Sequence, residues 1–250
     1  MMADILQKYD LGQFHKDLEE LHIILSDSQI EQFLIYYEML IEKNKVMNLT
    51  AITEFDEVMK KHFIDSLSLV KAYDSRDNLP ISVIDIGTGG GFPGIPLKIT
   101  FPHLKVTLMD SLNKRVDFLK EVIEELGLSD IDVIHGRAED FAKPGQLREQ
   151  YDLCVSRAVA NLSVLSEYCL PYVKVGGKFI SYKSEKIVEE MKDAEYAIQL
   201  LGGRIGEQVS FTLPDSDLFR NLFVVEKCDL TPAKYPRKAG MASKKPLKRG

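Results

Sequence analysis

The stretch Asp85-Ile86-Gly87-Thr88-Gly89-Gly90-Gly91 decides the fold that we expect of this 250-residue chain. It ends a short, apolar and β-branched run at residues 81–86, and Pro93 and Pro96 come soon after it. Glycines let a backbone turn sharply and approach a ligand without an intervening Cβ atom, and proline is tolerated in the first turn of a helix. The stretch therefore predicts a strand, a ligand-binding turn and a helix in direct succession.

Strands and helices alternate along the chain after this turn. Apolar runs predict further strands, at residues 106–110, 131–134, 151–155 and 177–182, near 204–213 and near 221–227. Helical spacing and glycine stop signals predict helices at about 114–126 and about 185–201. This alternation predicts an α/β fold in which helices cover both faces of a mostly parallel, seven-stranded sheet. Ligands of such sheets bind beyond the carboxyl ends of the strands.

The beginning of the chain has a helical pattern instead. Apolar residues recur at helical spacing between residues 30 and 41, and Ser28 with Glu31 matches a capping box that would begin this helix. A second helix-start signal lies at residues 53–56, and the polar stretch 73–80 is typical of a linker. The expected organisation is a helical extension at 1–75, a sheet domain at 76–230 and a basic tail at 231–250.

The glycines of the turn fit two classes of cofactor. Gly89, Gly91 and Gly94 match the dinucleotide fingerprint G-x-G-x-x-G, which is a weak signal by itself. Gly87, Gly89 and Gly91 match acid-x-G-x-G-x-G, in which the acid, Asp85, lies at the end of the strand itself. This second register resembles the turn of methyltransferases that use S-adenosylmethionine.

The residues around the turn favour S-adenosylmethionine. A carboxylate at Asp85 can order the turn and approach the ammonium group of that cofactor, whereas it would repel a pyrophosphate. Bulky Phe92 and Pro93 would also crowd a pyrophosphate. Asp110, 19 residues after Gly91, ends the next strand and can accept hydrogen bonds from both hydroxyls of a ribose. NAD enzymes share this last feature, and an acid that merely ends a strand is its alternative.

Seven motifs spread over the chain together resemble one protein family. They are residues 44–50 (NKVMNLT), 62–66 (HFIDS), 85–98 (DIGTGGGFPGIPLK), 110–115 (DSLNKR), 136–139 (GRAE), 156–160 (SRAVA) and 235–240 (YPRKAG). The family is that of the bacterial small-subunit ribosomal RNA guanine-N7 methyltransferases, once called glucose-inhibited division protein B. The resemblance covers about residues 20–248, and although several motifs are generic alone, their combination is highly specific.

The resemblance implies a class I S-adenosylmethionine-dependent methyltransferase, Rossmann-like in fold, with an N-terminal helical extension. It implies methyl transfer to N7 of one guanine in the decoding-region loop of 16S rRNA, guanine 527, with S-adenosylhomocysteine as product. The implied partners are 16S rRNA and the 30S ribosomal subunit. The resemblance, together with the glycine turn and the strand-end acid, predicts the residues of the cofactor site. They are Asp85, Gly87, Gly89, Gly91, Phe92, Asp110, Ala138, Glu139 and Arg157.

Methylation of guanine N7 needs no residue that removes a proton, because N7 has a free in-plane lone pair at neutral pH. The enzyme has mainly to align two reactants and exclude water, so no catalytic residue is certain. Arg157, at the end of the fourth expected strand, is the candidate for positioning guanine or cofactor, with a strand-end ion pair as its alternative. Cys154 fits the core better than a nucleophile. His62 fits RNA contact or packing, and Asn48 fits RNA contact or loop shaping.

The charge of the chain is unevenly distributed. The net charge is −6, yet residues 231–250 contain seven basic residues and no acid, which leaves −13 for the rest. A basic tail on an acidic domain is common in proteins that contact phosphate, although a solvated tail without a partner fits the charge equally well. Tyr235 fits either stacking on a base or packing against the domain. The RNA-binding candidates are Lys183, which is also compatible with an ordinary surface lysine, Arg237, Lys238, Lys244 and Lys245.

Other classes of protein are disfavoured. No stretch approaches the roughly 18 uncharged apolar residues of a membrane helix. The N-terminus lacks the apolar core of a signal peptide, so we expect a cytoplasmic protein. Three cysteines without C-x-x-C spacing and five scattered histidines predict neither disulfides nor a metal site. We expect a monomer, because no feature demands a dimer.

Three other functions are alternatives to an RNA methyltransferase. A small-molecule methyltransferase would not need the basic tail. A nicotinamide-dependent oxidoreductase would use the shifted glycine register. A ribosome-binding factor without catalysis would keep the cofactor fold and bind RNA, but it would transfer no methyl group.

Overall fold

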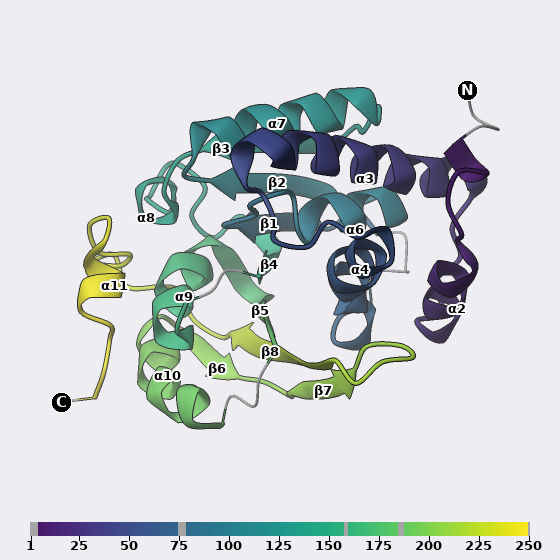
Figure 1. Ribbon diagram of the computed structural model, residues 1–250. Helices are drawn as coiled ribbons and strands as arrows, with labels where there is room; N and C mark the ends of the chain where they lie inside the picture. The colour runs from purple at the N-terminus through teal and green to yellow at the C-terminus, as the bar shows by residue number, and fades with distance from the viewer. Residues whose placement is uncertain (1–4, 75–78, 158–159, 185–187, 250) are drawn as a thin grey trace.

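The computed structural model describes residues 5–74, 79–157, 160–184 and 188–249 (Figure 1). Three features expected from the sequence fall partly outside these residues. They are the boundary between residues 75 and 76, the last part of the 156–160 motif, and the start of the helix near residue 185.

One sheet forms the centre of the molecule (Figure 1). In the described residues its strands follow the order β3-β2-β1-β4-β5-β8-β6, and β7 also pairs with β8. β1 to β5 are parallel, whereas β8 is antiparallel to β5, β6 and β7, so the predicted mostly parallel α/β sheet is confirmed. The strands are β1 (Ser82–Ile86), β2 (Lys105–Asp110), β3 (Ile131–His135), β4 (Tyr151–Ser156), β5 (Val173–Lys183), β6 (Gly203–Ile205), β7 (Val209–Thr212) and β8 (Phe219–Lys227).

The described sheet has eight strands rather than the seven expected, because the single strand predicted near residues 204–213 is divided. β6 pairs with residues 225–227 of β8, and β7 pairs with residues 219–222 of the same strand. Between them, Gln208 Nε2 donates to the carbonyl of Gly206 at 2.7 Å. This local hydrogen bond satisfies a backbone group where the ladder is interrupted.

Helices cover both faces of the sheet, as predicted. One core contains α2 (Gly12–Glu20), α3 (Asp27–Met47), α4 (Phe55–Val58), the π-helix η1 (Met59–Ile64), α5 (Asp65–Leu67), the 3₁₀ helix η2 (Ser68–Lys71), α6 (Gly94–Thr100) and α7 (Asn113–Glu125). The other contains α8 (Ala138–Phe141), α9 (Leu162–Cys169), η3 (Leu170–Tyr172) and α10 (Val188–Leu200), and α11 (Met241–Lys244) contacts α9. Successive strand residues alternate between the cores: Val83 and Leu108 face the first, Ile84 and Met109 the second.

The N-terminal helices share the first core with the sheet. Phe33, Tyr36 and Leu40 of α3 and Phe63 of η1 are fully buried, and they belong to the same cluster as the strand residues. Figure 1 shows α3 lying alongside α6 and α7. A helical N-terminal segment is therefore present, and it is packed into the core of the sheet.

The start of α3 differs from the sequence prediction by two residues. The N-cap is Ser26, whose Oγ accepts a hydrogen bond from Gln29 N, while Gln29 Oε1 accepts one from Ser26 N. The capping box predicted at Ser28 and Glu31 is therefore wrong. Gln29 Nε2 also donates to the carbonyl of Ile99 in α6 at 2.7 Å, so a contact between helices favours this register. The helix start predicted at residues 53–56 is confirmed, because α4 begins at Phe55, although its N-cap residue Glu54 forms no side-chain cap hydrogen bond.

The replacement Ser26→Ala should lower the free energy of unfolding by about 1 kcal/mol, because it removes one half of the capping box. Ser28→Ala is the matched control, since it changes the same side chain two residues further on and should cost much less. Urea unfolding followed by circular dichroism measures both values. Equal losses in the two variants would contradict the observed cap.

Candidate functional site

A cleft of about 530 Å³ opens at the carboxyl edge of the sheet. It occupies the position where ligands bind in open α/β sheets. Residues that follow three parallel strands line it, together with one side of α9. The lining includes Gly87 after β1, Asp110 and Leu112 at the end of β2, Ala138 and Glu139 after β3, and Tyr168 in α9.

The structure brings part of the predicted cofactor set together at this cleft. Four of its members line the cleft: Gly87, Asp110, Ala138 and Glu139. Gly89 adjoins them, because its N–H donates to Asp110 Oδ2 at 3.0 Å. The remaining predicted residues lie outside the lining, and they are Asp85, Gly91, Phe92 and Arg157.

Asp85 is completely buried beneath the glycine turn. Its Oδ2 accepts hydrogen bonds from Thr88 Oγ1 at 2.7 Å and from Gly94 N at 2.9 Å, which closes the turn onto the start of α6. Its Oδ1 has no hydrogen-bond partner among the described residues. Burial raises the pKa of Asp85 to about 7, and the hydrogen bonds from Thr88 and Gly94 oppose this shift.

Gly87, Gly89 and Gly91 of the turn all have left-handed backbones, and the last two differ in their surroundings. Gly89 has φ +61°, and a Cβ atom placed there would meet no atom within 4 Å, so the backbone faces open space. Gly91 has φ +106°, and a Cβ atom there would lie 2.5 Å from the hydroxyl of Tyr36. The space above Gly89 is open, and below the turn the buried Asp85 Oδ1 has no hydrogen-bond partner among the described residues. Both features fit a cofactor that carries a positive charge.

Asp110 orders the two loops that border the cleft. Its Oδ1 accepts from Leu112 N at 2.9 Å, and its Oδ2 accepts from Gly89 N at 3.0 Å and lies 3.4 Å from Arg115 Nη1. A carboxylate offers about four acceptor positions. Asp110 therefore keeps capacity for a ribose hydroxyl while it holds the turn in place.

Tyr36 of the helical extension supports the glycine turn from behind. Its hydroxyl donates to the carbonyl of Gly90 at 2.5 Å, and its ring stacks between Phe63 and Phe92 at 5.4 and 5.5 Å. Phe92, predicted at the cofactor, is thus largely buried in this aromatic cluster. The sequence analysis did not single out Tyr36, because its partner lies 54 positions further along the chain.

Arg157 joins the end of β4 to the helical extension. Its guanidinium donates to the carbonyl of Lys61 at 3.1 Å, to that of His62 at 3.1 Å and to Ser66 Oγ at 3.0 Å. It also pairs with Asp65 at 3.3 Å. An ion pair at the strand end is therefore present, and the positioning of guanine or cofactor by Arg157 stays a prediction.

His62 is packed rather than free. Its Nε2 lies 2.7 Å from Thr50 Oγ1, and its ring stacks on Phe92 at 4.5 Å. Burial and the nearby charge of Arg157 lower the pKa of His62 to about 3, so the ring is neutral at physiological pH. Asn48 has a left-handed backbone and ends α3 as its C-cap, a conformation that asparagine tolerates.

The predicted RNA-binding residues fall into two groups. Lys183 pairs with Glu190 at 3.1 Å and donates to the carbonyl of Ala160, and Arg237 forms a fork with buried Glu167. The charges of these two are already engaged within the protein. Lys238, Lys244 and Lys245 are exposed. Tyr235 is buried in the second core, so it packs against the domain.

Among the cleft residues that the sequence analysis did not assign to the cofactor site, Leu112 and Tyr168 have large side chains. Leu112 is 53% exposed although it is a large apolar side chain, and it lies two residues after the strand-end acid. Its position just after the strand-end acid could have identified Leu112 from the sequence, because ligand pockets bind flat rings against apolar side chains. Tyr168 had no signal, because only the packing of α9 brings it to the cleft.

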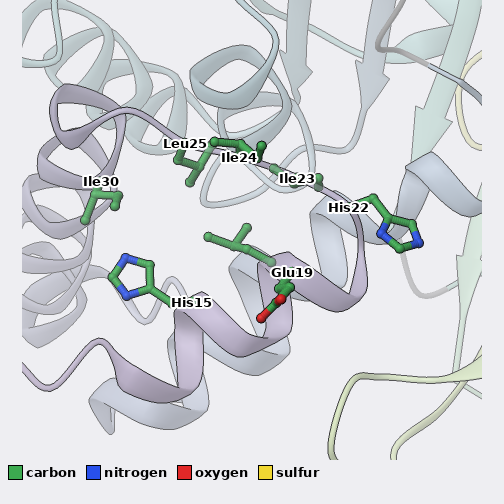
Figure 2. A pocket seen from close by; sticks show the side chains of 8 residues that line it. His15, Glu19, His22, Ile23, Ile24, Leu25 and Ile30 are labelled. Atoms are coloured by element: carbon green, nitrogen blue, oxygen red, sulfur yellow. The ribbon is translucent and has the colours of Figure 1, made fainter.

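A second pocket of about 470 Å³ lies between α2 and the start of α3 (Figure 2). It is mainly apolar, and Ile24 in its wall is 96% exposed. Figure 2 shows His15 and His22 at opposite ends of this pocket, so they do not converge on one point. Among the described residues, no group of three or more His, Cys, Asp or Glu side chains could hold a metal ion. No helix in the described part of the chain is long and apolar enough to cross a membrane.

The replacement Tyr36→Phe should weaken binding of S-adenosylmethionine about tenfold, because the buried carbonyl of Gly90 loses its partner and the turn loses its support. Tyr37→Phe is the matched control on the same helix, since its hydroxyl donates to the Thr53 carbonyl at an exposed site. Isothermal titration calorimetry gives both dissociation constants. Wild-type affinity in the Tyr36 variant would show that the turn needs no such support.

The replacement Asp85→Asn should change how stability depends on pH in the protein without ligand. Because the pKa of Asp85 is raised from 3.8 to about 7 by burial, its contribution to stability is lost as pH rises between these values. The variant should therefore gain stability relative to wild type, by up to about 1 kcal/mol per pH unit, from pH 4 to pH 7. Thermal unfolding across this range measures the difference, and parallel curves would contradict the shift.

Comparison with known proteins agrees with this architecture. The family model described as rRNA small subunit methyltransferase G matches residues 29–218. Proteins named ribosomal RNA small subunit methyltransferase G include one from Lachnoclostridium phytofermentans, 53% identical over 95% of this chain and 98% of its own. Another, from Bacillus cereus, is 51% identical over 96% of this chain and 100% of its own.

Solved structures share the fold at low sequence identity. MtNAS superposes with a TM-score of 0.53 at 17% identity, over 81% of this chain and 75% of its own. TrmN from Thermus thermophilus gives 0.50 at 20% identity, over 66% of this chain and 48% of its own. The fold is therefore that of the class I S-adenosylmethionine-dependent methyltransferases, as predicted. With the match over most of its length, the chain belongs to the rRNA small subunit methyltransferase G family.

Proposed function

We propose that this protein transfers a methyl group from S-adenosylmethionine to N7 of a guanine in 16S rRNA, guanine 527 by the family resemblance. The observation that carries the proposal is the cleft at the carboxyl edge of the sheet. Gly87, Asp110, Ala138 and Glu139 meet there, in a chain that belongs to a family of ribosomal RNA methyltransferases.

The residues of the cleft have the chemistry that this cofactor needs. Asp110 would accept hydrogen bonds from the ribose, and Leu112 and Ala138 would contact the adenine. The open backbone at Gly89 would let the methionine end approach. Asp85, below the turn, supplies negative charge near that end. When bound, S-adenosylmethionine supplies the methyl group as a sulfonium electrophile.

Two titratable side chains near the turn, His62 and Cys154, are poorly suited to act as a general base or a nucleophile. His62 is buried and neutral, and Cys154 is fully buried in β4, which excludes the exposed thiolate that methylation at cytosine C5 requires. N7 of guanine needs neither, since its lone pair is free. The contribution of the protein would then be alignment and exclusion of water. Arg157 would position the guanine or the cofactor by exchanging some of its present contacts in the helical extension.

Exposed lysines would contact the RNA backbone. Lys238, Lys244 and Lys245 are exposed in a segment without acids, and phosphate contacts position a protein on nucleic acid without reading sequence. Direct RNA contact by Lys183 and Arg237 is a weaker proposal, because both are engaged in ion pairs with Glu190 and Glu167.

The decisive experiment uses 30S subunits from a strain that lacks this gene. They are incubated with the protein and methyl-labelled S-adenosylmethionine, and the label is mapped by cleavage at 7-methylguanosine. One labelled guanine in the decoding-region loop is the expected result. Binding of the cofactor without label on 30S subunits or on naked 16S rRNA would refute the proposal and favour a small-molecule substrate or a non-catalytic factor.

The double replacement Lys244→Gln with Lys245→Gln should weaken RNA binding and reduce the slope of log affinity against log salt by about 2, since each phosphate contact releases counterions. Binding of S-adenosylmethionine alone should not change. The control is Lys105→Gln with Lys120→Gln, which removes the same charge from exposed positions of β2 and α7. Filter binding between 50 and 300 mM salt measures the slopes, and equal losses in both doubles would refute a local RNA contact.

A further inference from the structure

Two residues that line the cofactor cleft are also contacts of the C-terminal segment, residues 231–249. Glu139 Oε1 accepts a hydrogen bond from Gly240 N at 2.8 Å, and Glu139 is itself largely buried. The hydroxyl of Tyr168 lies 2.8 Å from Ser243 Oγ. The basic segment is therefore attached to the wall of the cleft.

A buried ion pair fixes where this attachment occurs. The side chain of Glu167 is only 1% exposed. It accepts three hydrogen bonds from Arg237, donated by the backbone N at 2.8 Å, by Nε at 2.9 Å and by Nη2 at 2.6 Å. Glu167 belongs to the same helix, α9, as Tyr168 of the cleft. Further upstream, Arg148 Nη1 donates to the carbonyl of Tyr235 at 2.8 Å. Because a buried carboxylate is costly to leave unpaired, the segment is held on α9 in one register.

The outer surface of the segment is positively charged. Its exposed basic side chains lie on both sides of Arg237 along the chain and flank the attachment at residues 240–243, with no acid between them. Figure 1 shows α11 and the chain around it beside α9. The exposed members are Lys234, Lys238, Lys244, Lys245, Lys248 and Arg249. A polyanion bound to this surface would contact the same short segment that touches Glu139 and Tyr168.

We propose that the C-terminal segment couples the two substrates: RNA phosphates bound to its lysines hold Gly240 and Ser243 against the cleft wall, so that RNA and cofactor strengthen each other's binding. The proposal rests on the proposed function, because it takes RNA as the polyanion. The first ligand to bind orders the C-terminal segment, so the second ligand no longer has to order it and binds more tightly. The coupling factor is the ratio of one ligand's dissociation constants without and with the other ligand, and it must be the same for both ligands.

The test measures the dissociation constant of S-adenosylhomocysteine with and without saturating 30S subunits from the strain that lacks this gene. The product is used because it cannot react, so binding is measured at equilibrium. In the wild-type protein we expect 30S subunits to tighten its binding about tenfold. The reverse titration, of 30S subunits with and without S-adenosylhomocysteine, should give the same factor.

Gly240→Ala should reduce this factor to about two or less, because Gly240 has φ +79° and alanine disfavours that backbone although its Cβ would meet no atom. Gly176→Ala is the matched control. Gly176 has φ +88° with equally free surroundings but lies in β5, away from the segment, so the factor should persist. Ser243→Ala, which removes the second contact, should lower the factor in the same direction with less risk to folding.

The outcomes separate this inference from the proposed function. Wild-type protein that binds both ligands without coupling would overturn the inference alone, and so would coupling that survives in both Gly240→Ala and Ser243→Ala. Wild-type protein that binds S-adenosylhomocysteine but no RNA at low salt would refute the proposed function, and the inference with it. The inference would be supported if the coupling factor fell in Gly240→Ala and Ser243→Ala but persisted in Gly176→Ala.

Discussion

The structure around the cleft depends on one buried carboxylate, that of Asp85 at the end of the central strand β1. By accepting hydrogen bonds from Thr88 Oγ1 and Gly94 N, it closes the glycine turn and fixes the start of α6. Burial at this depth penalises the charged carboxylate and raises its pKa to about 7, although the two hydrogen bonds oppose the shift. The second carboxylate, Asp110, ties the same turn to the end of β2 through Gly89.

The helical extension and the sheet form one unit around this turn. Tyr36 reaches the carbonyl of Gly90 from α3, and Asp65 pairs with both Arg157, just after β4, and Arg220 of β8. The π-helix at Met59–Ile64 turns the carbonyls of Lys61 and His62 toward Arg157. π-Helical turns are frequent at functional sites, and here one joins the extension to the carboxyl edge of the sheet.

The two faces of the sheet contribute different parts of the proposed enzyme. The first face supports the glycine turn through the extension, and the second carries α9 and the C-terminal segment. They meet at the cleft, where Gly87 comes from β1 and Tyr168 from α9. This division places the exposed lysines of the C-terminal segment beside Glu139 and Tyr168 of the cleft. The glycine turn, by contrast, lies against buried aromatic packing at Phe92 and Tyr36.

The sequence by itself determined the features that depend on neighbouring residues. These include the alternation of strands and helices, the strand-end acids Asp85 and Asp110, and the presence of Ala138 and Glu139 after the third strand. Each follows from local propensity, glycine conformation or period-two burial, which act within a few residues. The same local reasoning placed the α3 cap at Ser28, because it could not include the contact between Gln29 and α6.

Only the tertiary structure decided which polar groups remain available for a ligand. Arg237 belongs to the same basic tail as Lys244, yet it pairs with Glu167, and Lys183 pairs with Glu190. Tyr36 supports a carbonyl 54 residues away, and Gly240 reaches Glu139 across 101 residues. Such partners are chosen by packing of both cores at once, because a buried polar group must be satisfied by whatever the fold brings to it.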